Sequence, residues 1–294
     1  MANLKDIRTR IDSVKNTQQI TRAMKMVSAA KLRRAQQNVL SLRPYAHKLI
    51  QVISNIAVTQ RVSHPLLSKS ESPKKVLMVI LTSDRGLCGG FNSNISKFAM
   101  KFYQANKPKY ETLDLFFIGT KGRDYFRFRG VTSTDVMANL SKEVSYTLAA
   151  KIADRVMNDF SEGEYDAIYM VYNEFKSAIA QEVVCETLLP VDLSKATLET
   201  EAKTATFSKD MIFEPDPEKM IEELLKKHFT TQVYRCMCES VAAEHGARMT
   251  SMENATNNAG DMISKLTLTY NKLRQASITT ELIEITSGAE ALKG

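Results

Sequence analysis

Glycine and proline are scarce at both ends of the 294-residue chain, and this scarcity excludes an ordinary globular fold there. No proline follows Pro217, and from there to Ser287 the only glycines are Gly246 and Gly260. A continuous helix of roughly 70 residues would be about 105 Å long. Helices of globular proteins average about 11 to 12 residues, so a helix of this length cannot be buried in its own domain. It must pack against another helix.

A second long helix is predicted at the other end of the chain. From Asn3 to about Ile56 there is no glycine and a single proline, and apolar residues recur at helical spacing with shifts of register. Asn3 with Asp6 forms a weak capping box, and Asp216-Pro217 supplies an acceptor and a proline where the C-terminal helix should begin. A parallel homodimer would need only one such helix. We therefore expect one intramolecular antiparallel coiled coil.

The C-terminal helix carries a heptad seam, in which small or apolar residues alternate in steps of three and four. The expected inner positions are Met252, Ala255, Ala259, Met262, Leu266, Thr269, Leu273, Ala276, Thr280 and Ile283.

The sequence also lacks a long apolar run, a signal peptide and a disulfide framework. No run approaches the roughly 18 apolar residues of a transmembrane helix. The start, MANLKDIRTRI, has no apolar core, and acidic Asp6 and Asp12 argue against a transit peptide. We expect a soluble protein of a reducing cytoplasm. Neither disulfide nor metal-ligand spacing relates the four cysteines, which are Cys88, Cys185, Cys236 and Cys238.

Between the long helices, the pattern is typical of an α/β domain. In chain order it predicts a strand at 74–83, a helix at 94–105, a strand at 112–119, a helix at 145–160 and a strand at 165–173. This alternation favours a small Rossmann-like domain with a mostly parallel sheet. An antiparallel strand could follow over 175–189, after a turn at Asn173-Glu174.

The expected fold class is therefore α/β plus a long antiparallel coiled coil. Its parts are an N-terminal coiled-coil helix at 1–62, a central α/β domain at 74–205 and a C-terminal coiled-coil helix at 207–294. The predicted linkers, at 63–73 and 193–217, are rich in Ser, Thr, Pro and charge, as domain boundaries usually are.

Positive charge is concentrated near the N-terminus. Up to Ile50 there are eleven basic and two acidic residues, so this segment carries +9 and the remainder −2. A solvated coiled-coil face is the ordinary explanation. The alternative is an acidic partner, which could be nucleic acid, an anionic membrane or acidic protein loops. Nucleic acid is the least favoured, because Arg8 and Lys15 alternate with the apolar seam instead of lying beyond it.

No catalytic constellation is recognisable in the sequence. The loop SDRGLCGGFNSN at 83–94 follows a strand and precedes a helix, as a phosphate loop would, but lacks both GK[ST] and GxGxxG. The four histidines are far apart and accompany no nucleophile motif, and we expect His245 at a surface or an interface. We predict no catalytic residue, no cofactor and no metal. An enzyme that uses the 83–94 loop remains an alternative.

Four segments together resemble the gamma subunit of the rotary ATP synthase. They are ITRAMKMVSAAKLRRAQ from Ile20, SDRGLCGGFN from Ser83, EHGARMTSMENATNNAGDMI from Glu244 and NKLRQASITTELIEITSGAEAL from Asn271. They occur in the family's order and span nearly the whole chain. The resemblance implies a shaft of two helices at the centre of a hexamer of alternating alpha and beta subunits. It also implies that the α/β domain lies on the ring of c subunits, beside the epsilon subunit.

The resemblance further implies a mechanism and a location. Ion flow would turn the c ring and the shaft, and the shaft would drive the beta subunits, which hold the catalytic sites, through their states. The chain would lie at the cytoplasmic face of the bacterial inner membrane, as a peripheral protein that meets the membrane only through the complex. A cytoplasmic coiled-coil scaffold with a ligand-binding α/β domain is the alternative from another class.

Specific contacts are implied as well. The motif LRQASIT would bond a catch loop of one beta subunit, and an arginine there could donate two parallel hydrogen bonds to a carboxylate. Acidic loops of the beta subunits would be attracted to Lys31, Arg33 and Arg34. The implied catch-loop contacts are Arg274, Gln275, Thr279 and, on the neighbouring N-terminal helix, Met24.

Overall fold

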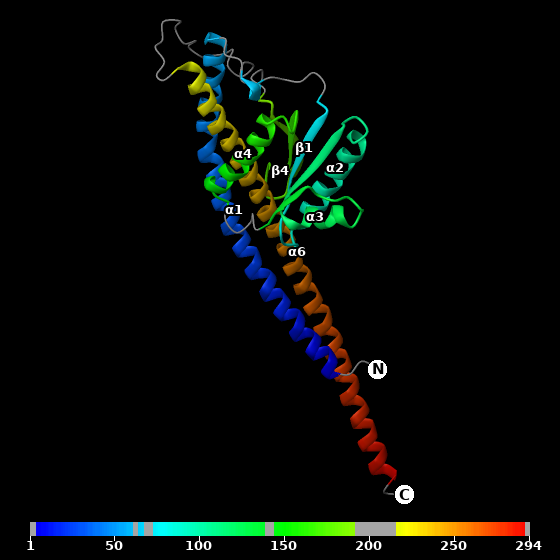
Figure 1. The fold of residues 1–294 in the computed structure, drawn as a ribbon. Helices are drawn as coiled ribbons and strands as arrows, with labels where there is room; N and C mark the ends of the chain where they lie inside the picture. The colour runs from blue at the N-terminus through cyan, green and yellow to red at the C-terminus, as the bar shows by residue number, and fades with distance from the viewer. Residues whose placement is uncertain (1–3, 61–63, 68–72, 139–143, 192–215, 292–294) are drawn as a thin grey trace. The chain divides into compact units, whose positions relative to one another are not determined.

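Two long helices dominate the computed structural model, which describes residues 4–60, 64–67, 73–138, 144–191 and 216–291. They are α1, Leu4–Gln60, and α6, Pro217–Ala291 (Figure 1). Helix α6 begins at Pro217 as predicted, and the Met220 N–H donates to the Asp216 carbonyl at 3.1 Å. The expected cap at Asn3 lies outside the described residues. The chain divides into two units, and each long helix contributes to both.

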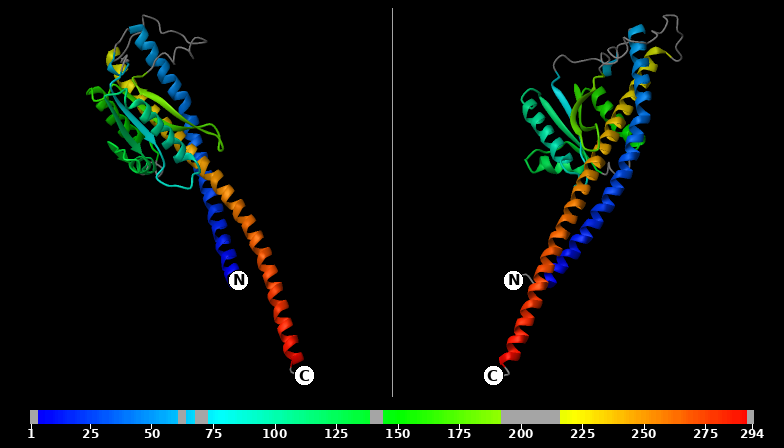
Figure 2. Two further views of the ribbon diagram at one scale, coloured as in Figure 1. Left: turned by 90° about the vertical axis from the view of Figure 1, so that its right-hand side faces the viewer. Right: turned by 180° about the vertical axis from the view of Figure 1, so that it is seen from behind.

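The first unit, Met1–Ser28 with Met249–Gly294, contains an antiparallel helix pair. The Thr21 and Thr256 hydroxyls lie 2.8 Å apart, and Lys25 Nζ lies 2.6 Å from Glu253 Oε1. Residue numbers therefore rise along α1 as they fall along α6, which confirms the antiparallel arrangement. Beyond about Leu273, α6 continues past the start of α1 (Figure 2), and its side chains there are almost all exposed.

The predicted heptad seam is half right. Every seventh residue from Met252 to Leu273 is buried or half-buried, as expected. Ala255, between the first two of them, is half-buried as predicted. Farther along, the seam uses the residue one place later than predicted, so Met262 is 46% exposed while Ile263 is half-buried. The predicted inner residues Thr280 and Ile283 are exposed, because they lie beyond the start of α1.

A heptad seam can alternate three then four residues or four then three. Adjacent apolar residues such as Met262 and Ile263 are compatible with both orders. The inner positions that the sequence reading missed are Thr256, Ile263, Tyr270 and Ser277.

The second unit, Ala29–Arg248, is built on a five-stranded sheet of order β3-β2-β1-β4-β5. Its strands are β1 (Lys75–Leu81), β2 (Thr112–Ile118), β3 (Asp135–Met137), β4 (Ala167–Phe175) and β5 (Gln181–Leu189). All neighbouring pairs are parallel except β4 with β5, which confirms the mostly parallel sheet. Strand β1 lies at the centre and is buried on both faces, as its apolar sequence KVLMVIL requires.

Helices cover both faces of this sheet. Helices α2 (Phe91–Asn106) and α3 (Thr120–Arg127) pack on one face, with Met78 and Ile80 of β1. The other face, with Leu77 and Val79, packs against α4 (Tyr146–Ser161) and against apolar residues of α1 and α6. Figure 1 shows α2 and α3 on the side of the sheet away from the long helices. The long helices α1 and α6 therefore pack on the Leu77 and Val79 face, and α2 and α3 cover the opposite face.

Three details of the middle segment differ from the sequence prediction. Strand β3, three residues long, and the short helix α3 were not foreseen. The turn predicted at Asn173-Glu174 is wrong: both residues lie in β4, and the chain reverses at Ser177, whose N–H donates to the Ala180 carbonyl at 2.9 Å. Cross-strand pairing as far as Phe175 with Gln181 overrides the local turn preference of asparagine.

Gly246 of α6 lies against the β4–β5 turn, and this contact generates a prediction. A Cβ atom at this position would lie 3.3 Å from the Cα and carbonyl oxygen of Ala178. We expect Gly246→Val to lower the free energy of unfolding by about 1–3 kcal/mol, because the turn must move away. Thermal unfolding and hydrogen exchange in β4 and β5 would measure this. The control is Gly288→Val, where nothing lies within 4 Å; equal effects of the two substitutions would contradict the packing argument.

Candidate functional site

The loop after β1 lies where Rossmann-like sheets bind ligands. In such sheets, ligands bind at the carboxyl ends of strands where the strand order reverses, which here is between β1 and β4. The loop closes on itself: Asn92 Nδ2 donates to Ser83 Oγ at 2.7 Å, and Ser83 Oγ donates to the Arg85 carbonyl at 2.6 Å. Leu87, at its tip, has a positive φ of 63° and is exposed. The loop is thus a self-bonded turn with one strained, exposed residue.

Helix α6 occupies the position beside this loop. Arg248 Nη2 donates to the Gly86 carbonyl at 3.2 Å, and Cys88 and Phe91 form a buried apolar cluster with Ala243 and Ala247 of α6. Arg248, a cation beside the loop, therefore bonds the chain's own backbone. This arrangement argues against the alternative in which the 83–94 loop serves an enzyme.

Arg248 belongs to a buried polar cluster. Its Nη1 donates to Glu244 Oε1 at 2.7 Å. Arg248 is only 8% exposed and Glu244 only 3%. Burial raises the pKa of Glu244, and Arg248 opposes this shift. His245 is also buried, so the expectation of a surface or interface histidine is wrong. The small neighbours Gly246 and Ala247 let this side of α6 approach the sheet domain closely.

A second arginine attaches α6 to the sheet farther along. Arg235 Nη2 lies 2.7 Å from Glu186 Oε2 of β5, and its Nη1 donates to the Tyr172 hydroxyl of β4 at 3.1 Å. Arg235 also bonds Glu239 on its own helix at 3.2 Å. Arg235 and Arg248 lie about 20 Å apart along α6. The sequence reading missed both; the only signal is their spacing of four from Glu239 and Glu244, which indicates an ion pair on a helix without showing that it is buried.

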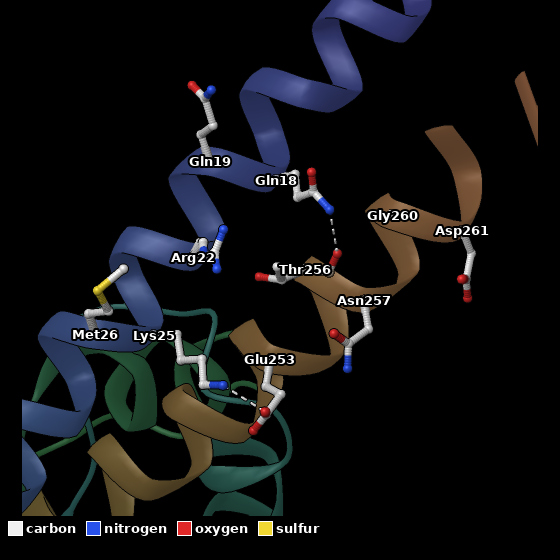
Figure 3. Close-up of a pocket in the computed structure, with 10 residues that line it drawn as sticks. All are labelled: Gln18, Gln19, Arg22, Lys25, Met26, Glu253, Thr256, Asn257, Gly260 and Asp261. Carbon is white, nitrogen blue, oxygen red and sulfur yellow. Dashed lines mark hydrogen bonds and ion pairs between the residues drawn. The ribbon is translucent and has the colours of Figure 1, made fainter. Parts of the chain in front are cut away.

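The helix pair of the first unit carries an open groove of about 640 Å³ (Figure 3). Most of the residues that line it have polar side chains, and Gln18 Nε2 donates across it to the Thr256 carbonyl at 3.3 Å. Polar contacts at a seam fix the register of a coil at some cost in stability. Glu253 neutralises Lys25, whereas Arg22 has no acidic partner among the described residues. The groove is lined by Gln18, Gln19, Arg22, Lys25, Met26, Glu253, Thr256, Asn257, Gly260 and Asp261.

The structure brings together some of the residues that the resemblance singled out. Arg274, Gln275 and Thr279 are exposed on the part of α6 near or past the start of α1, and Thr279 Oγ1 donates to the Gln275 carbonyl at 2.9 Å. Met24 is half-buried beside the Lys25–Glu253 pair. It therefore lies about 30 Å along the coil from Arg274.

The three cationic residues of the resemblance lie in the second unit, on α1. Lys31, Arg33 and Arg34 are all exposed, and none forms an ion pair within the described ranges. Lys31 acts electrostatically on Glu244 and His245.

The described residues include neither a membrane-spanning helix nor a cluster of metal-binding side chains. None of the described helices is long and apolar enough to cross a membrane. Likewise, no group of three or more His, Cys, Asp or Glu side chains that could hold a metal ion occurs in these ranges.

These features define a protein with a shaft-like architecture: a sheet domain is bonded to a long helix, and that helix extends beyond the helix with which it pairs. A family model described as ATP synthase matches residues 3–292. The protein named ATP synthase gamma chain of Bdellovibrio bacteriovorus is 64% identical over the full length of both chains. The one of Geobacter sp. (strain M21) is 50% identical, again with full coverage of both.

Solved structures agree in fold. A chain in the Euglena gracilis mitochondrial ATP synthase, solved with OSCP, F1 and c-ring, aligns with a TM-score of 0.66 and 22% identity over 98% of this chain and 94% of that chain. A chain of the Tetrahymena thermophila central stalk and c-ring aligns with a TM-score of 0.62 and 29% identity, over 80% and 99%. The chain belongs to the family of ATP synthase gamma chains. Its role is that of the rotor shaft, a non-catalytic subunit, and the catalytic sites lie on the beta subunits.

The buried Arg248–Glu244 pair predicts a strongly non-additive mutant cycle. Arg248→Met leaves the Glu244 carboxylate buried without its partner, so we expect a loss of about 3–5 kcal/mol in the free energy of unfolding. Adding Glu244→Gln should restore part of that loss. Chemical unfolding of the wild type, both single variants and the double variant gives the coupling. Additive losses would show that the two side chains act independently.

His245 predicts a dependence of stability on pH. Burial, Arg248 and Lys31 lower its pKa from 6.5 to about 4. Between these values the unfolded chain binds a proton that the folded chain does not, so stability should fall as the pH drops from 6.5 towards 4. The loss amounts to up to ~3 kcal/mol for this group. His228, whose pKa burial also lowers to about 4, adds a slope of the same sign. Unfolding of His245→Gln across this range should show a shallower slope than the wild type; identical slopes would exclude His245 as a source.

Proposed function

We propose that this shaft connects a ring of membrane-embedded c subunits to a hexamer of alternating alpha and beta subunits. The helix pair of the first unit turns inside the hexamer, and the α/β domain meets the c ring and the epsilon subunit. The observation that carries this proposal is the full-length match to bacterial gamma chains, together with an α6 end that has almost no partner among the described residues. The complex lies at the cytoplasmic face of the bacterial inner membrane, to which the chain is bound only through its partners.

Torque must enter this chain at the sheet domain and leave it along the helices. The contacts of Arg235 with β4 and β5 and of Arg248 with the β1 loop fix the sheet to α6 at two points. Two separated points resist twisting, which a single contact would not. Contacts between the shaft and the hexamer must instead break at every step, and exposed, individually weak interactions suit this requirement.

Arg274, Gln275 and Thr279 form the proposed contact with a catch loop of one beta subunit. They lie within two turns on one exposed helix, so a single loop can reach all three. Met24 is also proposed to contact a beta subunit. Because about 30 Å of coil separates it from Arg274, it must meet a different segment or a different copy of that subunit.

Lys31, Arg33 and Arg34 are proposed to attract acidic loops of the beta subunits. Their exposure and their lack of ion pairs among the described residues support this role. Charges on the surface act over roughly 10 Å at moderate salt, so these residues can bias where a mobile loop rests without binding it tightly.

Reconstitution tests the proposed function. The purified chain should show no ATP turnover, and mixing it with alpha and beta subunits should yield a complex whose turnover greatly exceeds that of either component. Single-molecule observation of a probe attached to the α/β domain should show rotation during hydrolysis. Turnover by the isolated chain, or a complex that turns over with the probe stationary, would contradict the shaft role.

The catch-loop contact predicts a defect in turnover with normal assembly. Charge-assisted hydrogen bonds contribute about 1.5–3 kcal/mol, and alanine is a good helix former. Replacement of Arg274 and Gln275 by alanine should therefore lower ATP turnover per complex several-fold while the yield of complex stays near that of the wild type. Lys265→Ala, at another exposed position of α6, is the matched control. Unchanged turnover would mean that these residues are ordinary surface positions.

The cationic residues predict an effect that depends on salt. Single exposed ion pairs contribute about 0–1 kcal/mol, so one reversal should change little. The triple variant Lys31→Glu, Arg33→Glu and Arg34→Glu should alter coupling between ATP hydrolysis and ion pumping at low salt, and the difference should shrink at high salt. The neutral triple glutamine variant separates loss of attraction from new repulsion. A triple reversal with wild-type coupling at low salt would leave only a solvated helix face.

A further inference from the structure

Charge is divided between two halves of the α/β sequence in the second unit. Residues 91–131, which comprise α2, β2 and α3, contain eight Lys and Arg against three Asp and Glu. Residues 144–189, which comprise α4, β4 and β5, contain eight Asp and Glu against three Lys and Arg. The positive half includes the two helices on the sheet face away from α1 and α6. This face, defined by α2 and α3 and called here the outer face, is therefore cationic.

Little acidic charge remains to neutralise the outer face. Asp124 already pairs with Arg123 at 2.8 Å, and Asp114 accepts a hydrogen bond from Tyr165 at 2.9 Å. Within the described ranges, six exposed cations of residues 91–131 have no acidic partner. They are Lys97, Lys101, Lys107, Lys109, Lys121 and Arg129.

A groove of about 590 Å³ lies at one end of the outer face, between the C-terminal end of α2 and the segment that follows α3. Met100, Tyr103 and Val131 line it with apolar atoms, and Lys107 and Arg129 are the cations in its lining. Lys107 Nζ lies 5.3 Å from the centre of the Tyr103 ring. Phe128, which precedes Arg129 in the sequence, is 87% exposed.

We propose that the outer face is a docking surface for an acidic protein segment, which inserts an apolar or aromatic side chain into this groove. Charge complementarity selects an acidic partner, and the apolar lining between two cations suits a side chain flanked by carboxylates. The excess of carboxylates on the other half of the same unit disfavours polyanions such as nucleic acid, which would be repelled over much of the domain. None of the residues of the outer face is among those proposed to meet the beta subunits.

Zero-length crosslinking of the intact complex tests the proposal. A carbodiimide activates a carboxylate, and a lysine amine in contact with it displaces the urea and forms an amide bond. We expect mass spectrometry to find Lys107 joined to an Asp or Glu of a different subunit, and Lys151 of α4, which is also exposed, to form no such bond. Charge reversal of the groove, Lys107→Glu with Arg129→Glu, should lower by about tenfold the yield of intersubunit bonds formed by Lys101 and Lys121. The reversal Lys151→Glu with Lys219→Glu should not.

Several results would overturn the proposal. One is that Lys107 forms no intersubunit bond and reacts with an amine reagent equally in the free chain and in the complex. A second is that its only partners are carboxylates of a second copy of this chain, which would indicate self-association. A third is that the two charge reversals lower the yield of intersubunit bonds equally. A fourth is that Lys107 is protected from the amine reagent in the complex and that nuclease treatment removes this protection. Assembly and ATP turnover of the complex are measured on the same samples, so failure of this surface is distinguishable from failure of the shaft role.

Discussion

A helix of 75 residues needs support along its length, and this need governs the whole structure. Most helical stability in water comes from packing of an apolar face and not from intrinsic propensity. Helix α6 obtains this packing in two ways: its first part against the sheet domain and α1, and its middle part against α1 alone. Among the described residues, its last part has almost no partner.

The sheet domain is arranged to serve this helix. A Rossmann-like sheet offers a binding position at the carboxyl ends of its central strands, and here that position receives Arg248 and the small residues around it. An architecture known for holding ligands thus holds its own shaft. Gly89 of the glycine-rich loop has a positive φ of 55°, which suits a tight turn, while the lysine and hydroxyl of a phosphate-binding motif are missing from the loop.

The sequence predicted most of the helices and strands correctly, but it predicted poorly which side chains of the long helices are buried. Both long helices, the strands of the parallel core and the start of α6 at Pro217 followed from periodicity and from proline and glycine positions. The buried state of His245 and the Arg235 contacts could not be predicted, because they depend on which face of a uniformly helical segment meets the sheet. The seam shows the same limit: the heptad length was readable, but the choice between Met262 and Ile263 depends on the partner helix. The catch-loop and acidic-loop residues rest on resemblance, since their partners lie outside this chain.

The unpartnered end of α6 has a consequence for how the protein meets its surroundings. From Ile278 onwards every described side chain is exposed. Within the part of the chain that the structure describes, that end is therefore held in helical form by local propensity alone, which is marginal over so short a length. The end of such a helix frays in isolation and becomes fully ordered when other subunits surround it. Part of the interaction energy is then used to order the helix, which weakens the net attachment. Weak attachment suits a rotor, because a helix end that the surrounding subunits order without binding tightly can turn from one orientation to the next.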